Sequence, residues 1–265
     1  MSIWSYNNNV RDTKAISDAT KLEHCVYCKT PLETLQNYSR EINGGSSGDV
    51  VFFRTCCCQV CGWWTKVQEA LQAYGDERGG YPAIDIYGAV GSLRELDLKD
   101  QSIPIEEIRA YLAAKYDARF DIDPWRFEET IASVYKDLGY ETRVTARSGD
   151  DGVDVILDGP DNSVIGVQVK RYKGKISVEQ IRSLAGALLL NGMTRGIFIT
   201  TSSFQSGAHS TTERLRLRGM PIELVDAKRF YEALGLAQRS MYKSIPDPTT
   251  PFFDATLIQI GVKFL

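Results

Sequence analysis

An acid, an amide and a lysine lie on two short apolar runs between positions 150 and 170. Asp154 is on the first run, and Gln168 and Lys170 are on the second. Because Gln168 and Lys170 are separated by one residue, their side chains leave the same face of an extended strand. A turn signal rich in Asp, Gly, Pro and Asn, residues 158–162, lies between the runs and favours their antiparallel pairing. The pattern predicts that a carboxylate, an amide carbonyl and an ammonium group converge at one end of a sheet.

These groups suit metal-dependent hydrolysis of a phosphodiester. Hard ions such as Mg²⁺ prefer oxygen ligands, and Asp154 is the natural anionic one. Lys170 brings positive charge to the place where the transition state becomes more negative. Glu128 borders the buried face of an expected helix beside Phe127, whereas Glu129 is expected to face solvent. Glu128 is therefore the preferred third acidic group.

The elements around these residues follow an alternating pattern from residue 123 onward. Asp123 followed by Pro124 marks a helix start, and Gly139 marks its end. The expected order is αβββαβαβα, an α/β fold with a mixed β-sheet flanked by helices. Helices are expected at 124–138, 178–190, 206–217 and 227–234, and strands at 142–145, 153–157, 164–170, 196–200 and 221–225.

All six cysteines lie between positions 25 and 61, which favours a metal site over scattered disulfides. Two Cys-x-x-Cys knuckles resemble a small N-terminal zinc ribbon with a structural Zn²⁺ ion, and redox dithiols or an iron–sulfur site are the alternatives. The expected zinc ligands are Cys25, Cys28, Cys58 and Cys61. Cys56 and Cys57 are expected to pack beside the second knuckle, although one of them replaces Cys58 if the register differs, and His24 is a less favoured ligand. Trp63 and Trp64 are expected to bury the metal module more readily than to stack on bases.

Residues 125–235 resemble the Mrr-type restriction endonuclease branch of the PD-(D/E)XK nuclease superfamily. The matching segments are 127–129, 138–140, 148–155, 168–172 and 196–204. The resemblance implies a restriction-endonuclease-like fold, Mg²⁺ as the catalytic cofactor and DNA as the substrate, cut to a 5′ phosphate and a 3′ hydroxyl. Asp154, Gln168 and Lys170 carry over as active-site residues, with Asp154, Gln168 and Glu128 as the Mg²⁺ ligands. Many members of the superfamily have an acid at the position of Gln168, but the Mrr-type branch itself uses glutamine.

Basic residues follow Lys170 closely. The net charge of −3 and the pI near 5.6 argue against a general polyanion-binding surface, so any nucleic-acid contact must be local. The predicted phosphate contacts are Arg171, Lys173, Lys175 and Arg182. Arg214, Arg216 and Arg218 fit a solvated helix end slightly better than a DNA contact, and Ser202 and Ser203 are further candidates for touching phosphate.

The division of the chain into parts follows from composition. We expect an N-terminal segment 1–20, a zinc ribbon 21–70, a linker and bridging helix 71–122, a nuclease domain 123–236 and a tail 237–265. The tail ends in an alternating strand, 256–264, which closes the protein's own sheet or pairs with a partner. No apolar run reaches about 18 residues and no signal peptide is evident, so we expect a cytoplasmic protein without a membrane partner.

The leading hypothesis is a Mg²⁺-dependent DNA endonuclease that defends against foreign or modified DNA. One alternative is a non-catalytic DNA-binding or assembly protein. Another is an effector nuclease that stays silent until a defence-system partner protein binds. Since one active site cuts one strand, double-strand cleavage implies a homodimer or repeated nicking.

Overall fold

The computed structural model of the 265-residue chain describes residues 4–7, 22–42, 49–73, 82–93, 95–145, 152–161 and 163–241. The chain divides into two compact units, unit 1 (Met1–Glu95 and Tyr242–Leu265) and unit 2 (Leu96–Met241). The predicted terminal strand 256–264 lies outside the described residues. Within those ranges, no helix is both long enough and apolar enough to cross a membrane.

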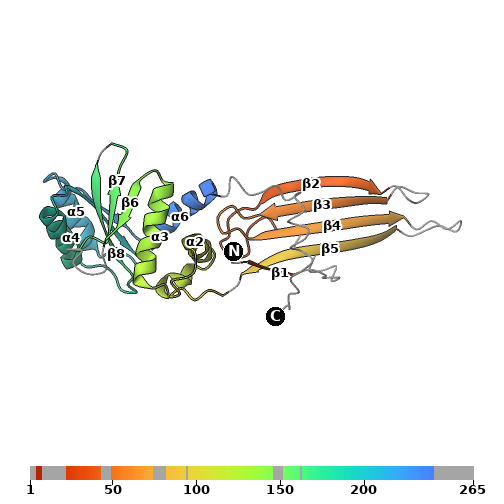
Figure 1. Ribbon diagram of the computed structural model, residues 1–265, viewed down its shortest axis with the longest axis horizontal. Coiled ribbons are helices and arrows are strands. Elements are labelled where there is room, and N and C mark those ends of the chain that lie inside the picture. The colour runs from red at the N-terminus through yellow and green to blue at the C-terminus, as the bar shows by residue number, and fades with distance from the viewer. Residues whose placement is uncertain are drawn as a thin grey trace. The chain divides into compact units, whose positions relative to one another are not determined.

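Unit 1 contains a five-stranded antiparallel sheet (Figure 1). Its strand order is β1-β5-β4-β3-β2. The first knuckle precedes β2 and the second connects β3 to β4. Because Glu33 at the start of β2 pairs with Cys57 at the end of β3, both knuckles lie at the same end of the sheet. The strands are β1 (Trp4–Asn7), β2 (Glu33–Ile42), β3 (Asp49–Cys57), β4 (Trp64–Ala73) and β5 (Pro82–Leu93).

The segment 71–122, expected as a linker with a bridging helix, is divided differently in the structure. Residues 71–73 complete β4, residues 82–93 form β5, and the helix α2 (Ile105–Ala114) belongs to unit 2. Apolar residues do alternate in β5, but Gly88 and Gly91 interrupt the pattern and weaken the strand signal. β5 pairs with β4 along residues 82–90 and with β1 along residues 90–93, and this long-range pairing stabilises the strand. The module that carries the cysteines is therefore larger than the predicted range 21–70.

Unit 2 contains a mixed sheet in the order β10-β9-β8-β7-β6. Strands β6, β7 and β8 pair antiparallel, whereas β8, β9 and β10 pair parallel. From α3 onward the order is αβββαβαβα, as predicted. After α2 come η1 (Tyr116–Phe120), α3 (Pro124–Asp137), β6 (Glu141–Val144), β7 (Val155–Asp158), β8 (Val164–Lys170), α4 (Val178–Leu190), β9 (Arg195–Thr200), α5 (Ser206–Arg216), β10 (Ile222–Val225) and α6 (Ala227–Met241).

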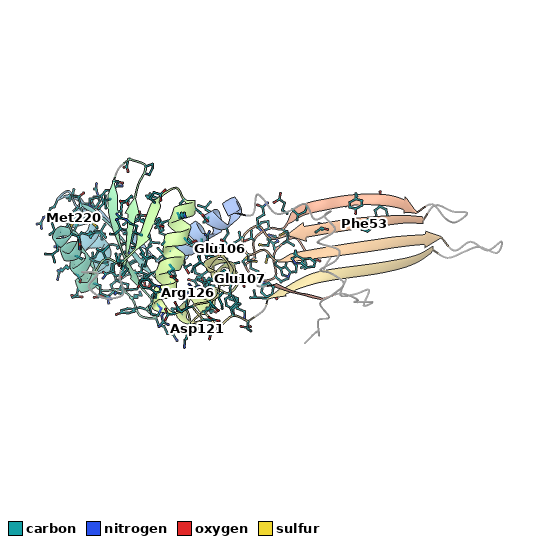
Figure 2. The ribbon with its side chains drawn as sticks, in the orientation of Figure 1. Phe53, Glu106, Glu107, Asp121, Arg126 and Met220 are labelled. Atoms are coloured by element: carbon teal, nitrogen blue, oxygen red, sulfur yellow. The ribbon has the colours of Figure 1, made fainter. Side chains whose placement is uncertain are left out.

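Helices cover both faces of this sheet, so the fold class predicted from the sequence is confirmed (Figure 1). On one face, Leu184 and Leu188 of α4 and Ala208 of α5 pack against Phe198 of β9. On the other face, α3 and α6 pack together, and the rings of Phe127 and Phe230 meet edge to face with centroids 5.4 Å apart. The side chains that fill unit 2 on both sides of the sheet are drawn in Figure 2. The two helical layers bury the strands that carry the candidate active-site residues.

Candidate active site and metal centre

Asp154 is fixed against β8 by its own side chain. The strand β7 begins at Val155, one residue later than Asp154, so Asp154 stands at the strand's entrance instead of within it. Its backbone N–H donates to the Val167 carbonyl (2.8 Å), and its Oδ2 accepts from the Val169 N–H (2.6 Å). The carboxylate oxygen thus takes the place of a backbone carbonyl as the acceptor for the Val169 N–H of β8. With only 6% of the residue exposed, it is held at a defined position beside β8.

Gln168 lies on β8 and is likewise 6% exposed. Within the described part of the chain, its Oε1 finds no hydrogen-bond donor. Its Nε2 lies on the side of Gly152, where an added Cβ would come within 3.8 Å of that nitrogen and 3.3 Å of Ala187 Cβ. Gly152 adopts φ +84°, a conformation that glycine reaches without strain. A buried carbonyl oxygen that lacks a donor costs about 1–3 kcal/mol, and a cation beside it would remove that cost.

Lys170 is the last residue of β8 and is half-buried. Gly166 shows which face of β8 packs against α4, because a Cβ added there would lie 2.5 Å from Leu188 Cδ2 of α4. Because side chains alternate along a strand, Gln168 and Lys170 leave β8 on the same face as Gly166, the face that α4 covers. The predicted common face of Gln168 and Lys170 is therefore present.

Glu128 belongs to α3, which packs on the opposite face of the sheet. The position of the N-terminal end of α3 follows from the directions of the strands. Since α3 precedes β6 through a tight turn and β6 runs in the same direction as β8, α3 starts at the end of the sheet where β8 finishes and β7 begins. Glu128 is half-buried at that end and remains the predicted third acid.

Glu129 does not simply face solvent as expected. Its carboxylate accepts from Trp125 Nε1 (3.1 Å) and from Arg126 Nη1 (2.6 Å), both on its own helix. Arg126 is buried, and an unpaired buried guanidinium would be costly, which explains why Glu129 is drawn toward it. The Glu129 carboxylate is therefore engaged within α3.

The four residues predicted to contact phosphate are all exposed. Arg171 donates to the Phe120 carbonyl, and Lys173 Nζ lies 5.7 Å from the centre of the Phe120 ring. These contacts hold two of the four cations beside η1. Among the second group of arginines, all exposed, Arg216 pairs with Glu213 (2.7 Å), in agreement with a solvated helix end.

The four predicted zinc ligands converge, and their sulfur atoms all lie within 4.8 Å of one another. Separations are 3.5 Å between Cys25 and Cys61, 3.4 Å between Cys28 and Cys58, and 3.7 Å between Cys28 and Cys61. A tetrahedral zinc ion with Zn–S bonds of about 2.3 Å sets its sulfurs about 3.8 Å apart. Disulfide sulfurs would lie about 2.0 Å apart, so these thiols are not oxidised pairs. The donor set fits a structural zinc ion.

The two knuckles share one backbone geometry. The residue after the second cysteine of each knuckle has a positive φ, 61° at Lys29 and 77° at Gly62. Each knuckle is also closed by a backbone bond from that residue to the first cysteine, Lys29 N to Cys25 O (3.1 Å) and Gly62 N to Cys58 O (2.9 Å). This turn aims both thiols of a knuckle at one point.

The neighbouring groups stay outside the sulfur cluster. Cys56 and Cys57 are buried beside it, as expected, and burial raises the pKa of Cys57 to about 12, so this thiol remains protonated. His24 is exposed and does not join the cluster. Trp63 is 1% exposed, which confirms the packing role expected for it. Elsewhere in the described ranges, no cluster of three or more His, Cys, Asp or Glu side chains has metal-binding geometry.

The mixed sheet of unit 2, with helices on both faces, is a restriction-endonuclease-like fold. Residues 120–234 match the family model Mrr_cat, described as a restriction endonuclease. This part of the chain is therefore similar to Mrr-type restriction endonuclease domains, and the resemblance expected for residues 125–235 is confirmed.

Two curated proteins are similar over the same part of the chain. The type IV methyl-directed restriction enzyme EcoKMrr of Escherichia coli (strain K12) is 32% identical over 115 residues, which cover 41% of this chain and 36% of the enzyme. The uncharacterized protein y4cE of Sinorhizobium fredii (strain NBRC 101917 / NGR234) is 30% identical over 127 residues, which cover 42% of this chain and 32% of that protein. The chain thus spans about a third of the length of these relatives.

Among solved structures, the MspJI restriction endonuclease in complex with a 27-mer oligonucleotide is similar with a TM-score of 0.34 and 15% identity. The alignment covers 97% of this chain and 72% of that one. A score of this size is too low to support a common fold over the whole chain.

Proposed function

We propose that unit 2 is a divalent-metal-dependent endonuclease that hydrolyses phosphodiester bonds of DNA in defence against foreign or modified DNA. The observation that carries the proposal is the juxtaposition of a buried carboxylate, Asp154, with a buried carbonyl oxygen of Gln168 that has no donor among the described residues. Both oxygen groups lose hydration on folding, and the Val169 N–H compensates only Asp154, so packing alone does not explain the buried Gln168 oxygen.

Asp154 and Gln168 would hold a Mg²⁺ ion, with Glu128 as the proposed third ligand. When bound there, the ion supplies activation of water and neutralisation of charge on the phosphoryl oxygens. Asp154 contributes the negative charge, and its bond from the Val169 N–H keeps the second carboxylate oxygen oriented. Gln168 contributes a neutral oxygen, so the charge of the site depends on Asp154 and Glu128.

Lys170 supplies a fixed positive charge on the same strand face as Gln168. During hydrolysis a water oxygen attacks the phosphorus and gives up a proton to solvent, while negative charge grows on the phosphoryl oxygens. The bond to the 3′ oxygen breaks, and that oxygen takes a proton from solvent to become the 3′ hydroxyl. The Lys170 ammonium stabilises that charge and can orient the attacking water. A lysine at a half-buried position does this more effectively than an exposed one, because water screens it less.

DNA is the proposed substrate because exposed cations follow the end of β8 along the chain. Arg171, Lys173 and Lys175 follow Lys170 directly, and Arg182 lies on the exposed side of α4. Such residues contact phosphates without reading sequence, and they make binding depend on salt. The Escherichia coli relative is named a methyl-directed restriction enzyme, which supports DNA as the polymer.

Zn²⁺ is proposed as a structural ion of unit 1. Its four thiolate ligands come from two knuckles that meet only when β2, β3 and β4 are paired. A closed site of four cysteines offers no open position for a reactant, so the ion would stabilise the fold and take no part in hydrolysis.

The proposal is tested by incubating the full chain with supercoiled plasmid, methylated and unmethylated, in Mg²⁺ or EDTA. We expect nicking or linearisation in Mg²⁺ only, and its loss in Asp154→Asn and Lys170→Ala. Lys228→Ala, which removes an exposed lysine on α6, is the matched control and should cut like the wild type. Digestion that is the same in EDTA, or unchanged in both site variants, would refute the assigned site. DNA binding that persists without any cutting would favour the non-catalytic alternative.

A further inference from the structure

Two segments that leave the sheet side by side have unequal lengths. Lys170 at the end of β8 pairs with Thr200 at the end of β9, and the segments pair again at Ile176 and Phe204. Between these points five residues, 171–175, run beside three, 201–203. The longer segment must bulge outward, and all five of its residues are exposed. We call residues 171–175 the basic loop, since it carries three of the four predicted phosphate contacts.

The shorter segment holds two carbonyl groups of the basic loop and the carbonyl group of Lys170 before it. Thr201 N–H donates to the Lys170 carbonyl (3.2 Å), and Thr201 Oγ1 donates to the Tyr172 carbonyl (2.9 Å). Ser202 Oγ donates to the Lys173 carbonyl (3.1 Å). These bonds turn two carbonyl groups of the basic loop, and that of Lys170 just before it, toward the shorter segment. The residues of the basic loop remain exposed, with Arg171 and Lys173 held beside η1 by their contacts with Phe120.

Thr201 is itself anchored from outside the sheet. Its carbonyl accepts from Arg119 Nε of η1 (3.0 Å), and the Arg119 guanidinium lies 3.7 Å from the Tyr116 ring centre and 4.0 Å from that of Phe120. In the other direction, Arg171 of the basic loop donates a hydrogen bond to the Phe120 carbonyl of η1. Thr201 is 1% exposed, so water has little access to its hydroxyl, although the accepting residue Tyr172 is 47% exposed.

We propose that Thr201 and Ser202 are positioning residues that preorganise the basic loop for the phosphate backbone. This inference rests on the proposed nuclease function and assigns to both hydroxyl groups an indirect role, in place of the direct phosphate contact expected for Ser202. A loop of five exposed residues would otherwise lose conformational freedom when DNA binds, and that loss would weaken binding. Because these hydroxyl hydrogen bonds fix the conformation of the loop before DNA binds, its cations can contact the phosphates without further ordering.

The test uses Thr201→Val, which replaces the hydroxyl by a methyl group of similar size. Thr201→Ser keeps the hydroxyl and should restore the wild-type behaviour. Thr212→Val is the matched control, since Thr212 Oγ1 donates to the His209 carbonyl (2.9 Å) on α5, away from the basic loop. Amide hydrogen exchange of residues 171–176 is measured without DNA. Affinity for a duplex oligonucleotide is then measured over a range of salt concentrations in Ca²⁺ or EDTA.

Loss of one bond of ordinary strength should change these equilibria about two- to tenfold. In Thr201→Val we expect faster loop exchange by that factor, weaker DNA binding, and a salt dependence of log K that is shallower by about 0.9 for each phosphate that the loop no longer neutralises. A purely structural defect would lower the folded fraction without changing this slope.

Unchanged loop exchange in Thr201→Val would overturn the inference whatever the activity. Altered exchange with wild-type affinity and slope would overturn it too. A wild type that never cuts DNA in Mg²⁺ would contradict the proposed function instead.

Discussion

The two roles of Asp154 can be separated by a pair of substitutions. Its carboxylate accepts the Val169 N–H at 2.6 Å and is also the proposed anionic metal ligand. Asp154→Asn keeps an oxygen acceptor and removes the charge. Asp154→Ala removes both and leaves a buried backbone N–H without its acceptor. The first variant therefore isolates the chemistry, and the second adds a structural defect.

The magnitudes follow from these contacts. A buried donor that loses its partner costs about 1–3 kcal/mol, so Asp154→Ala should lower the free energy of unfolding of unit 2 by that amount. Asp154→Asn should change it by less than about 1 kcal/mol, because the bond persists and a buried charge is relieved. A bound metal ion stabilises the transition state by several kcal/mol, and each 1.36 kcal/mol of activation free energy changes the rate tenfold. Both variants should cut DNA at least about 100-fold more slowly than the wild type.

Urea unfolding followed by circular dichroism at a helical wavelength measures the structural part, since every helix in the described ranges belongs to unit 2. Plasmid nicking at saturating Mg²⁺ measures the catalytic part. The Asn side chain keeps an acceptor for the Val169 N–H, whereas Ala removes it. Equal loss of stability in Asp154→Asn and Asp154→Ala would therefore refute the structural role of this bond. Cutting by Asp154→Asn within about threefold of the wild-type rate would refute the catalytic role.

Three further predictions concern the metal sites and the sheet. Cys61→Ser should lose zinc during purification, whereas Cys57→Ser should retain one zinc per chain. Elemental analysis measures the zinc content of both variants, and equal contents would contradict the assigned ligands. Glu128→Gln should raise the Mg²⁺ concentration required for half-maximal cutting, whereas Glu129→Gln should not, and a reversed result would exchange their roles. Gly166→Ala should destabilise unit 2 by about 1–3 kcal/mol in urea unfolding, because its Cβ would overlap α4, and a wild-type midpoint would contradict the packing.

Much of unit 2 could be predicted because its elements follow clear periods. The ranges of β8 and α4 agree with those expected from the sequence, and Leu184 and Leu188 are buried as predicted. The shared face of Gln168 and Lys170 follows from a spacing of two alone. The four cysteines could also be assigned from their spacing, since a knuckle leaves few ways to place two thiols.

Other features depend on contacts that the sequence does not encode locally. The strand β5 is stabilised by pairing with β1 and β4, and its own glycines weaken the local signal. Glu129 was expected in solvent, but the buried Arg126 draws it inward. The role of Thr201 arises from two loops of unequal length that happen to be neighbours, and helical or strand periodicity carries no information about that. The repeated hydroxyl residues at 200–203 were the only sequence signal.

The central claim is that Asp154 and Gln168 together hold a divalent cation beside Lys170. The most direct test is calorimetric titration of the zinc-loaded full chain with Mn²⁺, compared with Asp154→Asn and Gln168→Leu. We expect one further site per chain in the wild type and affinity at least about tenfold weaker in each variant, since each loses one of few oxygen ligands. Wild-type Mn²⁺ affinity in both variants would contradict the claim.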